Sequence, residues 1–253
     1  MPRKPRIKSE SGIYHIIMRG INRQTLFEDE EDCIKFINVL ERYKDICQYK
    51  LFAYCLMDNH LHLLLKEGKE PLETVMRRIC GSYVFWYNKK YDRIGYLFQD
   101  RFKSEPVEDD EYFLTVLRYI FKNPIKAGVT NRVKDYKWTN YGDYIEENKR
   151  TDTDFVLDNF NEASREYAIN EFITYINKEN SDECMDIPDK LRLTDNEAIK
   201  IIKESCKVEN GIDFQKLETE KRNLYIRRLK KLNLSIRQIE RLTGISRGII
   251  QKV

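Results

Sequence analysis

Long apolar runs are absent from this sequence. No stretch of it approaches the roughly 20 consecutive apolar residues that a membrane-spanning helix requires. The basic start MPRKPRIKSESG is followed by no apolar segment of the kind that a secretory signal contains. We therefore expect a globular cytoplasmic protein that contacts no membrane.

Paired cysteines are absent as well. The six cysteines are scattered along the sequence, at Cys33, Cys47, Cys55, Cys80, Cys184 and Cys206. No two of them form a C-x-x-C pair, which argues against a zinc ribbon and against the disulfide framework of a small secreted domain. We expect most of these cysteines to be buried thiols.

A strong net charge is also lacking, because the sum over the chain is only +3. This sum conceals a segregation along the sequence. Residues 1–143 carry 25 Lys and Arg against 21 Asp and Glu, residues 144–215 carry 9 against 18, and residues 216–253 carry 11 against 3. Such a division suggests two nucleic-acid-facing modules joined by an acidic segment, although charged faces also serve solvation alone.

Hydrophobic periodicity predicts strands and helices in the first part of the chain. Strand and helix patterns follow one another in the order β-α-β-β-α-β-α, over residues 12–19, 27–46, 49–57, 60–66, 72–91, 102–108 and 109–123. This order predicts an α+β domain with an antiparallel sheet and helices against one of its faces. Pro124 is expected to fix the end of the last helix.

Composition predicts three parts of the chain. We expect the α+β domain to cover residues 1–145. The acidic stretch of residues 146–190 lacks a single strong period, so a partly helical linker is expected there. From residue 191 to residue 253 the pattern is helical again, which predicts a small all-α domain.

Histidine is scarce, and two of the three histidines lie one residue apart in LMDNHLHLLLK. Side chains alternate along a strand, so Leu61 enters the core while His60 and His62 share the other face. Strands often present two ligands to one metal ion at this spacing. The alternative is a pair of hydrogen-bonded histidines at a sheet surface. For His15, in the first strand, we expect a local hydrogen bond rather than a metal ion.

The helix before Pro124 offers candidate partners for the histidine pair. Tyr119 and Asn123 are four residues apart and fall on one edge of that helix, so a phenol and an amide oxygen lie one turn apart. Two imidazoles and one oxygen ligand suit Mg²⁺ or Mn²⁺ holding a phosphate. The alternative is an ordinary amphipathic helix, in which Tyr119 packs and Asn123 caps the end.

Five ordered segments of the sequence resemble the REP-associated branch of the single-tyrosine HUH transposases. They are PRKPR, GIYHIIMRGINRQ, LMDNHLHLLL, YLFQDRFKS and LRYIFKNPIKAGV, and they cover about residues 1–144. The resemblance implies the ferredoxin-like antiparallel sheet of the HUH nuclease fold. It implies that His60-Leu61-His62 is the HUH motif, that Tyr119 is the nucleophile and that Asn123 is the third metal ligand. Wider relatives place glutamine at this last position.

The same resemblance implies a metal-dependent endonuclease and strand transferase that acts on single-stranded or hairpin DNA. Tyr119 would form a 5′-phosphotyrosine link and release a 3′-hydroxyl, which conserves the bond energy for rejoining. A tyrosine with a pKa near ~10 is a poor nucleophile at neutral pH, so Mg²⁺ or Mn²⁺ is expected as a cofactor. We expect a nucleoid-associated monomer or homodimer. The rival interpretation is a non-catalytic DNA-binding regulator derived from a transposase.

Residues 81–104 interleave tyrosines and a tryptophan with lysines and arginines, a composition suited to stacking unpaired bases and holding phosphates. The predicted DNA contacts here are Arg101 and Lys103, although core packing is the alternative for many of the aromatic residues. The N-terminal arm adds Arg3, Lys4 and Arg6, which would enter a groove or follow a strand. The alternative for the arm is a disordered basic tail.

The C-terminal sequence SIRQIERLTGISRGIIQKV is similar to helix-turn-helix units that bind duplex DNA. Ser235 is expected to cap one helix, Gly244 to make the turn and Ser246 to start the last helix. Arg247 and Gln251, four residues apart on that helix, are the predicted base-edge readers. The alternative is a small basic helical bundle used for dimer contacts.

Overall fold

The structure is a computed structural model that describes residues 6–146, 151–161, 163–186, 195–232 and 234–253. The chain forms two compact units, Met1–Ile187 and Pro188–Val253. Each unit has a hydrophobic core of its own. The first unit contains the predicted histidine pair, and the second contains the predicted helix-turn-helix sequence.

The first unit begins with the predicted elements in the predicted order. They are β1 (Ile13–Arg19), α1 (Glu30–Cys47), β2 (Lys50–Met57), β3 (His60–Lys66), α2 (Leu72–Lys90), β4 (Lys103–Pro106) and α3 (Asp110–Lys126). Short 3-10 helices lie at Ile21–Arg23, Val133–Asp135 and Tyr141–Tyr144. Acidic residues cap two helices, Asp29 at the start of α1 and Asp109 at the start of α3. The unit has an α+β fold, as predicted.

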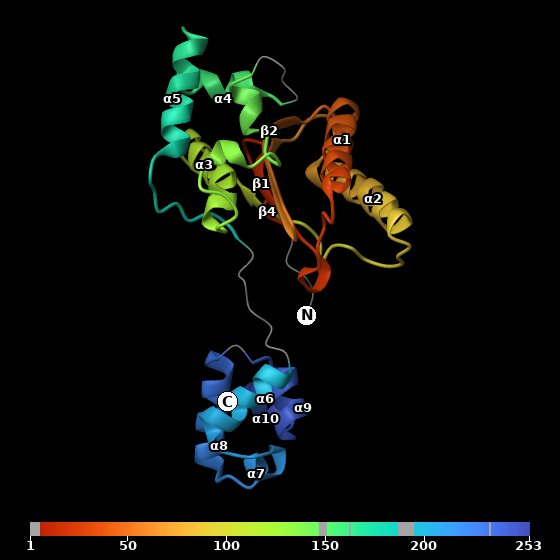
Figure 1. The fold of residues 1–253 in the computed structure, drawn as a ribbon, viewed down its shortest axis with the longest axis vertical. Coiled ribbons are helices and arrows are strands. Elements are labelled where there is room, and N and C mark those ends of the chain that lie inside the picture. Colours follow the sequence, from red (N-terminus) through yellow and green to blue (C-terminus); the bar gives the residue numbers. More distant parts are fainter. Residues whose placement is uncertain (1–5, 147–150, 162, 187–194, 233) are drawn as a thin grey trace. The chain divides into compact units, whose positions relative to one another are not determined.

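The four strands form one antiparallel sheet with the order β2-β3-β1-β4 (Figure 1). In the register of the central strands, Ile17 of β1 lies opposite His62 of β3 and Arg19 lies opposite His60. Turn-forming residues 58–59 connect β2 to β3. The two central strands therefore carry all three histidines.

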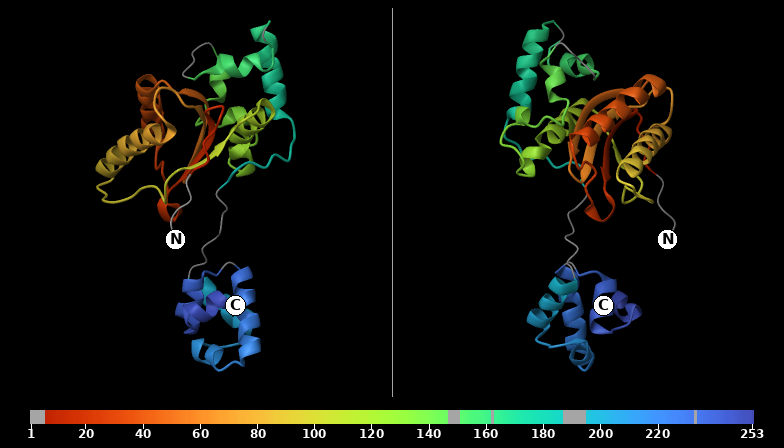
Figure 2. Two further views of the ribbon diagram at one scale, coloured as in Figure 1. Left: turned by 180° about the vertical axis from the view of Figure 1, so that it is seen from behind. Right: turned by 45° about the vertical axis from the view of Figure 1, so that its right-hand side comes forward.

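Alternation along β3 produces the two predicted faces. Leu61, Leu63 and Leu65 are fully buried in a core that includes residues of α1 and α2. Leu64 lies in a second core with residues of α3, on the face that His62 shares. Helices thus cover both faces of the sheet, and the prediction of a single covered face is wrong (Figure 1, Figure 2). The physical reason is that β1 is buried along its whole length, so both of its faces require cover.

α3 continues past Pro124, its predicted end. Proline lacks an N–H group and weakens the turn before it, but the residues after it still donate. The amide of Ala127 donates to the Asn123 carbonyl at 2.9 Å, and the amide of Val129 donates to the Pro124 carbonyl at 2.9 Å. The last turn therefore forms, and the helix ends at Lys126.

Two further helices, α4 (Thr153–Asp158) and α5 (Arg165–Asn177), lie in the segment predicted to be a linker. Phe172 of α5 is fully buried, and its ring stacks on that of Tyr144 with 4.4 Å between centroids. α5 packs beside α3, and α4 packs on α5 (Figure 1). Because these helices have apolar faces that need a partner, they join the second core of the first unit.

The second unit is all-α in the residues that the structure describes. Its helices are α6 (Asp195–Cys206), α7 (Gly211–Gln215), α8 (Thr219–Lys231), α9 (Ile236–Thr243) and α10 (Arg247–Lys252). Ser235 and Gln238 form a capping box at the start of α9. Gly244 ends α9 with a φ of 73°, and a side chain there would strike Gln215. The predicted helix, glycine turn and helix follow one another, while their role stays a prediction.

Among the described residues, no helix combines the length and the apolar character that crossing a lipid bilayer demands. All six cysteines are free. Four of them are buried, namely Cys33, Cys47, Cys55 and Cys206. The prediction of mostly buried thiols is confirmed.

Candidate active site

All three histidines lie together on the α3 face of the sheet. His15 of β1 and His62 of β3 are completely buried, and their rings stack with 5.4 Å between centroids. His15 Nε2 lies 3.1 Å from His62 Nδ1, within hydrogen-bonding distance. The ring of His60 lies edge-on to that of His62, with 5.3 Å between centroids. The scarce residue type is therefore concentrated at one place.

Asn123 of α3 lies between two of these histidines. Its side-chain oxygen, Oδ1, lies 3.3 Å from His60 Nε2, and its nitrogen, Nδ2, lies 3.2 Å from His62 Nε2. Asn123 is only 6% exposed. The fold thus brings together the three residues predicted to hold a metal ion, although Asn123 follows the histidines by 63 and 61 residues.

Hydrogen bonds hold both imidazoles in place. His60 Nδ1 lies 2.8 Å from Asn59 Oδ1, and His60 Nε2 lies 3.3 Å from Asn123 Oδ1. At His62, Nε2 accepts from the Asn123 amide, so Nδ1 carries the proton and donates to His15. Both Nε2 atoms therefore face the same carboxamide.

Burial keeps His62 neutral. Removal from water lowers the pKa of His62 well below its ordinary value of 6.5, and the neighbouring basic groups His15, His60, Arg19 and Lys126 lower it further. Metals bind the neutral form of an imidazole, through the nitrogen that carries no proton. His62 therefore has the protonation state of a metal ligand at neutral pH.

The donor atoms fit a divalent cation. His60 Nε2 and Asn123 Oδ1 lie 3.3 Å apart, and both an imidazole nitrogen and an amide oxygen can coordinate such a cation. In the part of the chain that the structure describes, no group of three or more His, Cys, Asp and Glu side chains is arranged to hold a metal ion. The candidate set therefore consists of two imidazoles and one amide oxygen.

Tyr119 lies one turn before Asn123 on α3, against the histidines. Its ring meets those of His15 and His62 edge-on, with 6.0 and 5.8 Å between centroids. The side chain is only 4% exposed, and its hydroxyl donates to Asp186 Oδ2 at 2.8 Å. Burial, followed by the hydrogen bond to Asp186, raises the pKa of Tyr119 well above its usual value of 10. The hydroxyl is therefore firmly protonated in this arrangement.

The carboxylate at Tyr119 belongs to residues 178–186, a segment after α5 that we call the acidic strap. Arg118 of α3 binds both carboxylate oxygens of Asp182 in the strap, at 2.6 and 2.8 Å. The strap thus follows α3 and ends at the Tyr119 hydroxyl. Sequence reasoning missed Asp186, because it lies 67 residues after Tyr119 in a stretch whose composition indicates only a solvated linker.

Glu105 of β4 is a second residue that sequence reasoning missed. Its Oε2 atom lies 3.6 Å from His15 Nδ1, which is too long for a hydrogen bond, and it accepts from the Tyr112 hydroxyl at 2.7 Å. These contacts lower the pKa of Glu105 below its ordinary value of 4.5, with His15 as the largest cause. A line of groups therefore runs from Glu105 through His15 to His62. His15 forms a hydrogen bond to His62 of the neighbouring strand, not to a residue near it in the sequence.

A cavity of about 430 Å³ opens beside Tyr119. Lys122 and Lys126 line it from α3, and Asp182 lines it from the strap. Lys126 Nζ lies 4.9 Å from the centroid of the Tyr119 ring. The two lysines therefore place positive charge next to the phenol.

The predicted DNA contacts of the first unit are only partly described. Arg3 and Lys4 lie outside the described residues. Arg101 and Lys103 are exposed, and Arg6 is half-buried. Arg6 donates to the carbonyl oxygen of Phe102 at 3.1 Å.

The predicted base readers of the second unit differ in their surroundings. Gln251 is exposed on α10. Arg247 forms an ion pair with Glu240 of α9, with 3.0 Å between Nη2 and Oε2. Contact of Arg247 with a base therefore requires an exchange of partners.

Comparisons with known proteins agree with the sequence motifs. The model of a family described as "Transposase IS200 like" matches residues 8–123, which include the histidines, Tyr119 and Asn123. A curated relative from Haemophilus influenzae (strain ATCC 51907 / DSM 11121 / KW20 / Rd), provisionally named REP-associated tyrosine transposase, is 29% identical over 114 residues. This match covers 39% of the present chain and 64% of the relative, so the chain spans less than two thirds of that relative's length.

A solved transposase structure shares the fold of the first unit. A REP-associated tyrosine transposase bound to a REP hairpin matches with a TM-score of 0.50 and 16% identity, over 57% of this chain and 86% of that chain. A provisionally named transposase from Deinococcus radiodurans R1 matches with a TM-score of 0.34 and 19% identity, over 47% of this chain and 95% of that chain. Residues 8–123 therefore resemble the IS200-like transposase family, and the α+β fold of the first unit agrees with that resemblance.

Proposed function

We propose that this protein cuts and rejoins single-stranded DNA at hairpin or repeat sequences, as a metal-dependent transposase. The meeting of His60, His62 and Asn123 next to Tyr119 is the observation that supports this proposal most directly. A phenol beside two imidazoles and an amide oxygen has the composition of a site that transfers a phosphoryl group to tyrosine.

Tyr119 would be the nucleophile. In the proposed reaction its oxygen forms a bond with the phosphorus of the scissile phosphate, while the bond from phosphorus to the 3′-oxygen breaks. The phenol loses its proton during the attack, and the 3′-oxygen leaves as a hydroxyl. The 5′-phosphate stays on Tyr119, and attack by a 3′-hydroxyl on this link rejoins a strand without hydrolysis.

Asp186 would control whether the Tyr119 hydroxyl can lose its proton and attack. Its carboxylate holds the hydroxyl proton at 2.8 Å and keeps the pKa of the phenol high. A carboxylate and a phosphate repel each other at short distance. We infer that Asp186 must move away before the scissile phosphate reaches Tyr119, after which Lys122 and Lys126 face that phosphate.

His60, His62 and Asn123 would hold the cation. When bound there, Mg²⁺ or Mn²⁺ would polarise the phosphate and neutralise the charge that develops on its oxygens. The contribution of the chain is to hold both imidazoles with their Nε2 atoms directed at Asn123. The hydrogen bonds to Asn59 and His15 perform this positioning.

The second unit would bind duplex DNA and direct the first unit to its sites. Residues 216–253 carry 11 basic residues against 3 acidic ones, an excess that favours contact with phosphates. α9 and α10 are joined by the Gly244 turn, and Gln251 is exposed on α10. These features support a helix-turn-helix reader with a short last helix.

A DNA-binding regulator without activity is the second candidate. One observation favours it, because Tyr119 is nearly buried and its hydroxyl is engaged by Asp186. The two candidates differ in one product, since only the enzyme forms a covalent link between Tyr119 and DNA.

The test incubates the protein with labelled DNA hairpins that carry single-stranded flanks, in Mg²⁺ or Mn²⁺, before denaturing electrophoresis. A covalent protein–DNA adduct is expected, and it should disappear with chelator and in the Tyr119→Phe protein. Tyr167→Phe is the matched control, because it removes the hydroxyl of an exposed tyrosine on α5. An adduct that survives Tyr119→Phe would exclude this nucleophile, and hairpin binding without any adduct would establish the regulator.

A further inference from the structure

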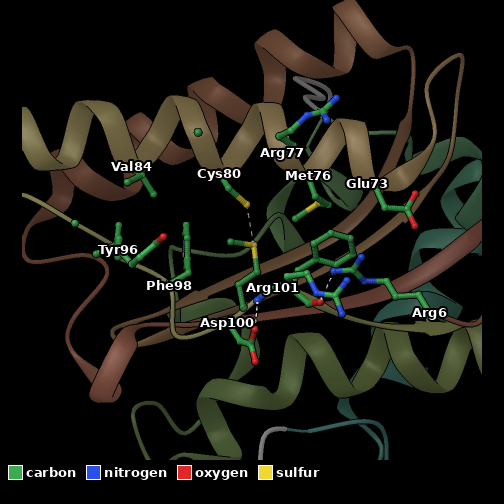
Figure 3. Close-up of a pocket in the computed structure, with 15 residues that line it drawn as sticks. Arg6, Glu73, Met76, Arg77, Cys80, Val84, Tyr96, Phe98, Asp100 and Arg101 are labelled. Atoms are coloured by element: carbon green, nitrogen blue, oxygen red, sulfur yellow. Dashed lines mark hydrogen bonds between the residues drawn. The ribbon is translucent and has the colours of Figure 1, made fainter. Parts of the chain in front are cut away.

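A second and larger cavity lies on the other face of the sheet. Its volume is about 600 Å³, within the range of about 300–1,000 Å³ that is typical of ligand pockets. One wall is α2, and the facing wall is the segment of residues 95–102 that leads into β4 (Figure 3). Met18 of β1 contributes from the sheet, on the face that packs against α1 and α2. The cavity is therefore separate from the histidine site.

The lining of this cavity is largely apolar and aromatic. Met18, Met76 and Leu97 are buried beneath it. The rings of Tyr96 and Phe98 line the wall opposite α2 (Figure 3), and Tyr96 is 84% exposed. Aromatic rings at the side of an apolar slot provide stacking surfaces for a flat ring such as a nucleobase.

Two guanidinium groups meet at one end of the cavity. Arg6 Cζ lies 3.7 Å from the centre of the Phe102 ring, and Arg6 also donates to the Phe102 carbonyl at 3.1 Å. Arg101 lies beside Arg6 (Figure 3). Burial lowers the pKa of Arg6, and the charge of Arg101 lowers it further. Like charges held so close together favour an anion between them, such as the phosphate of a nucleotide.

Gly81 provides an independent observation. It lies inside α2, where glycine weakens a helix relative to alanine, and it lines the cavity. A Cβ atom built at Gly81 would meet no atom within 4 Å, so packing within the protein does not require glycine there. Because Gly81 has no side chain, the cavity stays open at α2. A ligand can therefore approach the helix backbone closely there.

Two carboxylates, those of Glu73 and Asp100, also line the cavity. They would repel a phosphate that bound alone, so the cavity is not a simple anion site. Carboxylates accept hydrogen bonds from the exocyclic amino groups of bases, as Asp and Glu do from cytosine N4. With Arg6 and Arg101, they match a ligand that has an anionic end and an amino group elsewhere.

We propose that this cavity binds one unpaired base of single-stranded DNA, stacked between α2 and Phe98, with the adjoining phosphate on Arg6 and Arg101. The proposal rests on the proposed function for its substrate class, but it requires neither cutting nor a metal ion. Cytosine fits better than thymine, because its amino group can donate to Glu73 or Asp100.

The test measures binding in the absence of cutting. Tyr119→Phe protein with chelator is titrated into fluorescent oligo-dC, oligo-dT and an abasic strand of equal length, and fluorescence anisotropy gives each Kd. Oligo-dC is expected to bind at least about fivefold more tightly than the abasic strand, because stacking contributes about 1–3 kcal/mol per base. Oligo-dC should also bind more tightly than oligo-dT.

Two substitutions locate this binding in the cavity. Gly81→Leu fills the cavity from α2, so the Kd values for oligo-dC and the abasic strand should become about equal, while the unfolding temperature should not fall, because leucine favours helix. Arg101→Ala should weaken the binding of both strands alike. Arg78→Ala is the matched control, because it also removes one positive charge. Arg78 lies on α2, pairs with Glu70 and does not line the cavity.

Discrimination between oligo-dC and the abasic strand that persists in Gly81→Leu would overturn the proposal, because the base would then lie elsewhere. Equal Kd values for the two strands before that substitution would overturn it too. Equal losses in Arg101→Ala and Arg78→Ala would exclude the phosphate site. A protein that discriminates bases but forms no adduct would overturn the proposed function alone, so the two failures are distinguishable.

Discussion

His15 and His62 are joined by a hydrogen bond of 3.1 Å between neighbouring strands, 47 residues apart in the sequence. The contact is diagonal, because His62 lies opposite Ile17 and His15 lies opposite Leu64 in the register of β1 and β3. The bond fixes one tautomer of His62, with the proton on Nδ1 and the lone pair on Nε2. One histidine therefore orients another that is predicted to bind the metal ion.

Loss of this bond should weaken metal binding. We expect His15→Leu to lower the affinity for Mn²⁺ by about 10- to 100-fold, as loss of the groups that orient metal ligands does elsewhere. His15→Gln should retain more affinity, because its side-chain oxygen can accept from His62 Nδ1. Calorimetric titration of Tyr119→Phe protein with Mn²⁺ measures the affinities. Equal affinity for His15→Leu and His15 proteins would show that the bond has no such role.

Neutralising the carboxylate at Tyr119 should speed the proposed reaction. We expect Asp186→Asn to raise the rate of adduct formation severalfold, because the phenol pKa falls and the repulsion of the scissile phosphate is removed. Glu179→Gln, an exposed change in the same strap, is the control. Quenched time courses on denaturing gels give the rates. A slower reaction in Asp186→Asn would instead identify Asp186 as the base that takes the phenol proton.

The buried, neutral His62 should make stability depend on pH. Its folded-state pKa lies well below 6.5, so below pH 6.5 the unfolded chain takes up a proton that the folded chain does not. The free energy of unfolding should therefore decrease as pH falls, by up to about 1.4 kcal/mol per unit for this group. Glu105 contributes little in this window, since a lowered carboxyl pKa acts only near and below its ordinary 4.5.

Urea unfolding at about pH 7 and about pH 5.5 measures the free energy of unfolding at each pH. Substitution of His62 then isolates its own contribution to the difference. In His62→Gln the decrease between these two values should be smaller than in the unsubstituted protein. A slope of the same size in both proteins would mean that folded His62 takes up a proton in this range.

Substitutions on α10 should separate the two proposed DNA-binding activities. We expect Arg247→Ala and Gln251→Ala each to weaken duplex binding by about 1–3 kcal/mol, the usual contribution of a good base contact. Adduct formation on short single strands should not change. Glu240→Gln should tighten duplex binding, because it releases Arg247 from its ion pair. Electrophoretic mobility shifts measure these affinities. If the unsubstituted protein does not bind duplex DNA, the second unit is not a duplex-binding helix-turn-helix.

Features that depend on local periodicity could be predicted from the sequence. Alternation along β3 correctly put Leu61 and His62 on opposite faces of the strand. Helical spacing put Tyr119 and Asn123 on one edge of α3, where both meet the histidines. The end of α3 at Pro124 was wrong, because the residues after the proline still supply helical donors.

Features that depend on distant contacts could not be predicted. The acidic composition of residues 146–190 does not reveal that Phe172 packs on Tyr144 or that Asp186 reaches Tyr119. The pairing of His15 with His62 needs the register of β1 and β3, which no single strand pattern contains. Chain topology, and not local composition, determined these contacts.

Tyr119 and Asn123 lie one turn apart on α3, whereas His60 and His62 belong to a central strand of the sheet. A helix moves as one body, so a displacement of α3 that withdraws the phenol also withdraws the amide. In the proposed site, phosphate activation and capture of the cut end are therefore interlocked. Cutting would leave the 5′ end joined to Tyr119 and only the 3′-hydroxyl end free, so the protein would keep hold of one of the two ends that it makes.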